Sequence, residues 1–148
     1  MYLNDGRIMY EAIGGRPTLE KVHKVFYDKV YAHPWIGQYF AGTDQTLIEN
    51  QQTDFMSARM GGPKNYLGKL PMPAHKHMFI DTELFDLRQN LLGESLKEVG
   101  IEEVIIKQWL NLDEAFRKGI EKRSLDDCQQ RYADEPVMNF PNPNRRAA

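Results

Sequence analysis

Residues 18–32, with the sequence TLEKVHKVFYDKVYA, decide the fold class of this 148-residue chain. Apolar side chains recur in this stretch at intervals of three and four: Leu19, Val22, Val25, Phe26 and Val30. This period is typical of an amphipathic helix that buries one stripe of its surface. We expect the helix to end at His33-Pro34, because the residue before a proline is pushed out of helical geometry.

Working outward, apolar periodicity predicts three further helices, over about residues 45–60, 82–99 and 102–123. Thr43-Asp44 supplies side-chain oxygens that can cap the first of these, and Asp81 or Thr82 can cap the second. Gly100 is expected to stop the second, since glycine readily adopts the left-handed backbone that ends many helices.

The remaining segments show neither helical nor strand periodicity. Residues 61–73 contain three glycines and three prolines and are predicted to form a loop with one helical turn near its end. From Leu125 the pattern dissolves into Asp, Gln, Pro and Asn. We therefore predict an all-α domain over residues 1–124 and a C-terminal extension over residues 125–148 that is extended or partly disordered.

Composition excludes several classes of function. Lys plus Arg is 19 and Asp plus Glu is 21, so no basic excess is available to bind nucleic acid. No apolar run approaches the roughly 18 residues that indicate a membrane span, and no signal-peptide pattern opens the chain, so we expect a soluble cytoplasmic protein. A single cysteine, Cys128, excludes an intrachain disulfide and a metal cluster held by cysteine alone.

Three polar side chains fall where the periodicity predicts the interior. Gln52 shares a helix face with Ile48, Tyr27 follows Phe26, and His75 lies in an apolar, proline-broken stretch. Taken singly, each has a structural interpretation: a glutamine at the stripe edge, a boundary tyrosine and a hydrogen-bonded histidine. His75 and His77 also form an H-x-H pair, but no strand or third ligand is predicted that would complete a zinc site.

Ordered motifs join these residues across positions 9–123. They are Tyr10-Glu11-Ala12-Ile13-Gly14-Gly15, Phe26-Tyr27-Asp28-Lys29-Val30 before His33-Pro34, Tyr39-Phe40-Ala41-Gly42-Thr43-Asp44, Phe55 to Pro63, Tyr66-Leu67-Gly68, and Ala74-His75 with Ile80 and Phe85 five and ten residues after the histidine. In order and spacing the chain resembles the truncated, two-over-two haemoglobins, most closely their first group. The resemblance implies two crossed antiparallel helix pairs with a b-type haem held between them.

The resemblance also implies a role for each unexpected residue. His75 is expected to ligate the haem iron, with the opposite position left for gas. Tyr27 and Gln52 are expected to donate hydrogen bonds to bound oxygen from the distal side. Ile48 occupies the usual distal-gate position. The expected haem-binding residues are Phe40, Ile48, Phe55, Met56, Tyr66, Lys69, His75 and Met78, of which Tyr66 and Lys69 lie where family members contact the propionates.

The chain departs from the family pattern in specific places. Residues 45–60 contain no histidine, so no second histidine from the distal helix is available to the iron. Arg88 stands where the family usually has an apolar residue near the haem. The tryptophan characteristic of the second group is absent from that helix. His77 competes with His75 as the iron ligand, although choosing it breaks the spacing to Ile80 and Phe85.

Three hypotheses for function follow from these residues. The first is a haem protein that reversibly binds oxygen, nitric oxide and carbon monoxide, for oxygen transport or gas chemistry. The second is a nitric oxide dioxygenase that depends on an external reductase, because the chain has no flavin or nicotinamide motif. The third is a haem-free helical module in which the histidine is structural and the extension binds a partner.

Overall fold

The helix predicted around residues 18–32 is the central element of the fold. A computed structural model describes residues 1–144 of the chain, and in it α2 runs from Arg16 to Ala32. Its buried face carries the predicted apolar stripe together with His23 and Tyr27. The helix ends at His33, whose backbone is extended before Pro34, as expected for a residue that precedes a proline.

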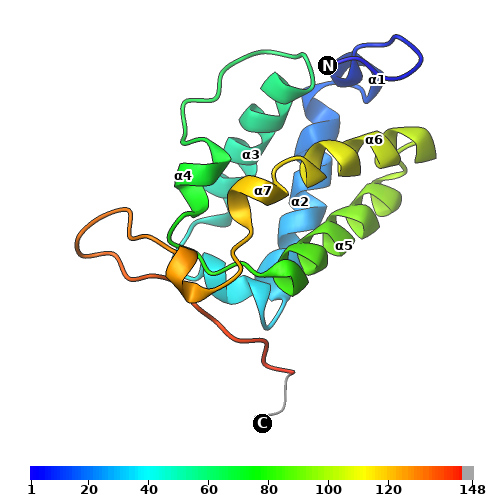
Figure 1. The fold of residues 1–148 in the computed structure, drawn as a ribbon. Coiled ribbons are helices and arrows are strands. Elements are labelled where there is room, and N and C mark those ends of the chain that lie inside the picture. The colour runs from blue at the N-terminus through cyan, green and yellow to red at the C-terminus, as the bar shows by residue number, and fades with distance from the viewer. Residues whose placement is uncertain (145–148) are drawn as a thin grey trace.

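The second predicted helix is α3, from Gln45 to Arg59, and it runs antiparallel to α2. Asp44 caps it by accepting a hydrogen bond from the Leu47 backbone N–H at 3.2 Å. A 2.7 Å hydrogen bond joins Gln45 to Asp28 near the end of α2. Figure 1 shows the two helices side by side, which makes them the first helix pair of the fold.

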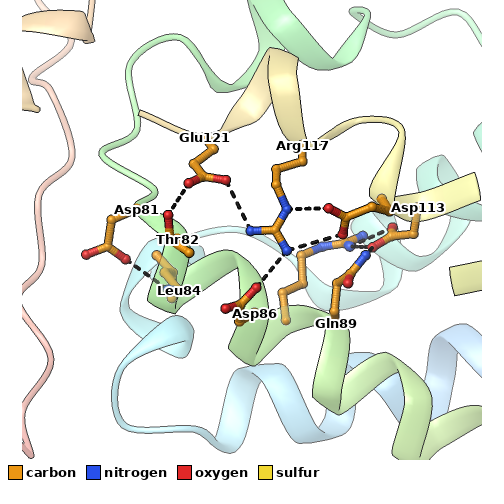
Figure 2. Close-up of polar contacts among 10 residues, drawn as sticks. Asp81, Thr82, Leu84, Asp86, Gln89, Asp113, Arg117 and Glu121 are labelled. Atoms are coloured by element: carbon orange, nitrogen blue, oxygen red, sulfur yellow. Dashed lines mark hydrogen bonds and ion pairs between the residues drawn. The ribbon is translucent and has the colours of Figure 1, made fainter. Parts of the chain in front are cut away.

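The second pair consists of α5, from Thr82 to Val99, and α6, from Glu103 to Glu114. Asp81 caps α5 through the Leu84 N–H at 2.9 Å (Figure 2). Gly100 ends the helix with a φ of 87°. Since α5 packs against both α2 and α6, the two pairs lie one over the other. The described residues contain no strand, only two isolated bridges, so the all-α fold with two pairs of helices is confirmed.

The fourth predicted helix is interrupted, which corrects the sequence-based boundary at residue 123. α6 ends at Glu114 and is followed by the short α7, from Arg117 to Ile120. In Figure 2 the Arg117 side chain reaches Asp86 of α5 at 2.6 Å and Glu121 at 3.1 Å. The central carbon of the Arg117 guanidinium also lies 4.3 Å from the centre of the Phe85 ring. These tertiary contacts occur where the helix is interrupted between α6 and α7. The spacing of apolar residues in residues 102–123 does not predict them.

Within residues 1–144, four further short elements lie before, between and after the long helices. They are α1 (Met9–Ala12), the 3-10 helix η1 (Ile36–Phe40), α4 (Pro71–His75) in the predicted loop, and the 3-10 helix η2 (Leu125–Asp127). α4 packs against α7, so the loop between α3 and α5 is anchored near its end. No helix in the described part of the chain is long and apolar enough to cross a membrane.

After η2, residues 128–144 first form a loop that projects from the helical body and then return past η2 toward the C-terminus (Figure 1). Met138 forms a parallel bridge with Met78, and its N–H donates to the His77 carbonyl at 2.8 Å. Phe140 packs edge to face on Tyr39, and its carbonyl accepts a 2.7 Å hydrogen bond from the Trp35 indole. Residues 145–148 of the predicted extension lie outside the described residues.

Candidate functional site

A cavity of about 360 Å³ lies between the helix pairs and the loop that carries α4. Nine of the ten residues predicted for the site line it: Tyr27, Phe40, Ile48, Gln52, Phe55, Tyr66, Lys69, His75 and Met78. Met56, the tenth, is not part of this lining, because it is only 1% exposed and packs in the hydrophobic core. The fold therefore places residues that are far apart in the sequence around one cavity.

A larger groove of about 830 Å³ lies at the surface near Trp35, the start of α5 and Asn142. As far as residues 1–144 define it, this groove contains none of the predicted site residues. The chemistry suggested by the sequence is therefore located in the smaller cavity.

His75 is the last residue of α4, and its ring is held in one orientation. Its Nδ1 lies 2.7 Å from the carbonyl oxygen of Pro71, one turn earlier on the same helix. Since a carbonyl can only accept, Nδ1 carries the proton. Burial lowers the pKa of His75 to about 4, partly opposed by the hydrogen bond to Pro71, so the ring is neutral near pH 7. The lone pair is then on Nε2, which has no hydrogen-bond partner among the described residues.

Lys122 holds the backbone next to His75. Its buried ammonium donates to three carbonyl oxygens: those of His75 at 3.0 Å, Met78 at 3.1 Å and Ile120 at 2.6 Å. Burial lowers the pKa of this lysine. The three bonds join the end of α7 to the end of α4, so they fix the segment that carries the histidine. Sequence analysis did not single out Lys122.

His77 has a different environment. It is 2% exposed and is not part of the cavity lining. Its Nε2 lies 3.6 Å from a carboxylate oxygen of Glu135, and its Nδ1 has no partner among residues 1–144. Of the two histidines of the H-x-H pair, only His75 lines the cavity.

Tyr27 brings a phenol from the buried face of α2. Its ring packs edge to face against Phe26 and Phe40, with centroids 4.8 and 5.9 Å away. Burial raises the pKa of Tyr27 to about 12, so the hydroxyl keeps its proton near pH 7. This hydroxyl makes no hydrogen bond within residues 1–144 and is not fully covered by protein. Tyr27 is therefore a donor available to a ligand in the cavity.

Gln52 brings an amide from α3. The side chain is partly buried and makes no hydrogen bond to the described residues. Ile48, one turn earlier on the same helix, adds an apolar side chain to the lining. The Phe55 ring packs edge to face against Tyr66 and at a tilt against Phe116, with ring centres 5.1 and 5.4 Å away, and all three residues line the cavity.

Two cations line the cavity from the loop and from the C-terminal segment. Lys69 contacts the Tyr132 hydroxyl, and its ammonium lies 4.8 Å from the centre of that ring. The Tyr66 hydroxyl donates to the Lys69 carbonyl at 2.5 Å, which links the two residues predicted to approach propionates. Arg131 pairs with Glu135 at 2.8 Å. Sequence analysis missed Arg131, because its position depends on the C-terminal segment folding back.

Arg88 and Asp113 form an ion pair in the lining. Nη1 of Arg88 donates to both carboxylate oxygens of Asp113 at 2.6 Å, and the Asp113 side chain is only 4% exposed. Sequence analysis singled out Arg88 but not Asp113. A signal was available, because Asp113 lies four residues after Trp109 and three before Phe116 on the predicted buried stripe.

These residues fit a haem. A neutral imidazole with a free nitrogen suits the proximal ligand of haem iron. The cavity walls include Phe40, Phe55 and Met78, which can cover a flat apolar ring, and two cations can pair with carboxylates at its edge. The volume is within the usual range for small-molecule and cofactor sites.

Comparison of this chain with known protein families assigns it to one of them. A family model for bacterial-like globins matches residues 8–121. The chain belongs to this family of globins.

More specific relatives are group 1 truncated hemoglobins. The one from Tetrahymena pyriformis is 34% identical over 116 residues, which cover 78% of this chain and 96% of the relative. The one from Mycolicibacterium paratuberculosis is 31% identical over 93 residues, which cover 63% and 68%. These relatives confirm the resemblance found in the sequence.

Solved structures agree with this assignment. The crystal structure of truncated hemoglobin from Tetrahymena pyriformis in the Fe(III) form superposes with a TM-score of 0.74 at 32% identity, covering 79% of this chain and all of the other. A truncated oxygen-avid haemoglobin from Bacillus subtilis gives 0.69 at 28% identity, covering 78% and 100%. The present chain is thus a truncated globin, a class of haem-binding and gas-binding proteins.

Proposed function

We propose that this protein holds one b-type haem through His75 and reversibly binds oxygen and other diatomic gases. One observation carries the proposal: a neutral imidazole with an uncommitted Nε2 and a phenol with an uncommitted hydroxyl line the same cavity. When bound, the haem supplies an iron whose open coordination position takes the gas. The chain's own residues decide how the haem is held and how the gas is stabilised.

His75 acts as the tether in this proposal. Its proton on Nδ1 donates to the Pro71 carbonyl, which fixes the tautomer and makes the ring a better ligand. The low pKa of His75 means that protons do not compete for the ligating nitrogen near pH 7. No other histidine lines the cavity as residues 1–144 define it, and α3 contains none. We therefore expect that, among residues 1–144, no histidine besides His75 would hold the iron, and that the side of the cavity facing Tyr27 would stay open to a gas.

Tyr27 and Gln52 act on the gas. A haem would supply an iron that polarises oxygen, and the Tyr27 hydroxyl and the Gln52 amide would then stabilise the oxygen by donating hydrogen bonds to it in a dry cavity. Carbon monoxide becomes much less polar, and the same donors favour it less. The high pKa of Tyr27 keeps its hydroxyl a donor and opposes its binding to iron as a phenolate. The pair is therefore expected to slow the release of oxygen.

The remaining residues shape the haem site. Phe40, Phe55 and Met78 supply apolar walls, and Ile48 is the apolar gate residue. Tyr66 and Lys69 are proposed to face the propionates, since Lys69 brings a cation to the lining. Met56 does not line the cavity and packs in the hydrophobic core instead.

Oxygen transport in the cytoplasm is the proposed setting. The support is compositional: the chain has one cysteine, whereas small secreted domains are commonly rich in paired cysteines. Nitric oxide dioxygenation, with a separate reductase to restore ferrous iron, uses the same cavity and is decided by the experiment below. Cell fractionation with detection of the native protein tests the location.

The direct test is the absorbance spectrum of the protein expressed with a haem precursor. We expect a Soret band, and an oxygen-bound spectrum when the reduced protein meets air. His75→Gly is expected to lose the normal ligation, whereas His77→Gln keeps it. Absence of a Soret band from the parent protein contradicts the proposal. Mixing the oxygen-bound form with nitric oxide then separates the roles, because rapid nitrate formation with re-reduction by an added reductase indicates dioxygenation, and slow oxidation indicates oxygen carriage.

A further inference from the structure

Arg88 places a positive charge in a cavity wall that is otherwise largely apolar on α5. Leu84 and Phe85 precede it by four and three residues on the same helix, and all three line the cavity. One face of α5 therefore looks into the cavity and carries the guanidinium there. The carbon at its centre lies 5.4 Å from the centre of the Phe26 ring, next to Tyr27 in the sequence.

The ion pair with Asp113 uses only part of this guanidinium. Both hydrogen bonds to the carboxylate come from Nη1. An arginine side chain has five N–H donors on three nitrogens. Nε and Nη2 make no hydrogen bond within residues 1–144, and neither is fully covered by protein. The Arg88 side chain is 24% exposed and lines the cavity, so it retains donors for a ligand.

Asp113 anchors the charge. Its carboxylate also accepts a hydrogen bond from the Gln89 amide at 3.3 Å, shown in Figure 2. Two neighbours on α5 therefore hold the aspartate, and it in turn fixes Nη1 of Arg88. A donor held in place before the ligand arrives loses little entropy when it binds. A surface arginine has no such restraint.

We propose that Arg88 makes this cavity selective for small anions, such as azide or nitrite, over neutral ligands of similar size. This inference rests on the proposed haem site, because an anion that binds the iron reaches the cavity where the uncommitted donors of Arg88 lie. Arg88 then adds a charged donor to the neutral donors Tyr27 and Gln52. Hydrogen bonds between ionised partners are about twice as strong as neutral ones, so the charged donor decides the preference.

The test compares azide with nitric oxide on the ferric, haem-loaded protein. Arg88→Leu is expected to lower azide affinity by about tenfold or more, since a charge-assisted hydrogen bond is lost. The affinity for nitric oxide, which is neutral, should stay within about twofold. Arg88→Lys keeps the charge without the planar fork, so we expect an intermediate azide affinity.

A second variant guards against misfolding. Arg88→Leu leaves the Asp113 carboxylate buried without its cation, so the double variant Arg88→Leu with Asp113→Leu removes both charges together. It should fold, show the Soret band and bind azide as weakly as the single variant. The antisymmetric stretching band of bound azide in the infrared should also shift between parent and variants, which a purely structural arginine would not cause.

The two proposals fail in different ways. Loss of the Soret band in the parent protein removes the haem site and this inference with it. A normal Soret band with azide affinity and infrared band unchanged in both leucine variants overturns the inference alone. In that case Arg88 and Asp113 are only a structural link between α5 and α6.

Discussion

Two walls of one cavity treat their polar groups in opposite ways. The histidine wall is made of His75 and Pro71 and is supported from outside the lining by Lys122. These residues use their donors within the protein: Nδ1 of His75 donates to one carbonyl oxygen, and the Lys122 ammonium donates to three. The donor wall, made of Tyr27, Gln52 and Arg88, keeps donors that no described residue accepts. The histidine wall fixes the orientation of the His75 ring, whereas the donor wall leaves hydrogen-bond donors available to a ligand that binds reversibly.

The difference explains where burial is tolerated. A fully buried donor without a partner costs about 1–3 kcal/mol. On the histidine wall this cost is avoided because each donor has a carbonyl partner in the protein. On the donor wall it is avoided because the donors are not fully covered by protein, which also leaves them available to a ligand. Substitutions on the two walls should therefore affect different measurements, stability on the first and ligand release on the second.

The largest effect is expected from Lys122→Met, which removes the support behind the histidine wall. The change removes a buried ammonium and leaves three carbonyl oxygens without it, which should lower the free energy of unfolding by about 3 kcal/mol. Urea denaturation of the haem-loaded protein measures this. Lys118→Met, at an exposed position of α7, is the matched control and should change stability little. Equal stability of the two variants would show that the three hydrogen bonds do not hold this wall.

Tyr27→Phe on the donor wall should leave stability almost unchanged and speed the release of oxygen. Loss of one hydrogen bond to a charged ligand, about 2 kcal/mol, corresponds to an off-rate about thirtyfold higher. Gln52→Leu should give a smaller increase, about fivefold, since an amide is a weaker donor to the ligand. Stopped-flow displacement of oxygen measures both rates.

Tyr31→Phe is the control for this measurement. Tyr31 lies on the same helix, but its hydroxyl already donates to the Thr43 carbonyl at 2.9 Å. Its removal should not change the off-rate. A parent-like rate in Tyr27→Phe, or a Tyr31→Phe rate that rises as much, would contradict the assignment of Tyr27 to the donor wall.

The smallest effect concerns the pH dependence of the unfolding free energy that is caused by His23, a buried residue next to Tyr27 on α2. His23 lies one turn earlier on α2, is 2% exposed, and pairs with the Thr53 hydroxyl at 2.7 Å. Burial lowers its pKa to about 3, so the unfolded chain binds a proton from about pH 6.5 downward while the folded chain does not. Its contribution to stability is thus full above pH 6.5 and is lost progressively toward pH 3.

The test compares the parent with His23→Gln, which cannot titrate. Between pH 7 and 5.5 the parent should lose about 1 kcal/mol more unfolding free energy than the variant. Other titrating groups, including His75, are common to both proteins and cancel in the comparison. Parallel pH profiles would mean that His23 is accessible to protons in the folded protein.

Local rules predicted most of the fold. Asp44 and Asp81 cap helices as their sequence positions indicate, and Gly100 ends α5 in the left-handed conformation. The break between α6 and α7 was not predictable from residues 102–123, because their apolar period continues through it. It coincides with contacts of Arg117 to Asp86 and Phe85, which are distant in sequence.

The sequence likewise predicted some residues of the cavity lining and missed others. Periodicity and the family motifs located Tyr27, Gln52 and His75, because each is an exception on an apolar stripe or part of a motif. Arg131 gave no signal, since only the folded C-terminal segment brings it to the cavity. Met56 satisfied the spacing of its helix face, but the phase of α3 places it in the core.

The central claim is that Nε2 of His75 holds the haem iron, and resonance Raman spectroscopy of the reduced, gas-free protein tests it most directly. An iron–histidine stretching band should be present in the parent and in His77→Gln. It should be absent from His75→Gly and return when imidazole is added. The same band in His75→Gly without imidazole would contradict the claim.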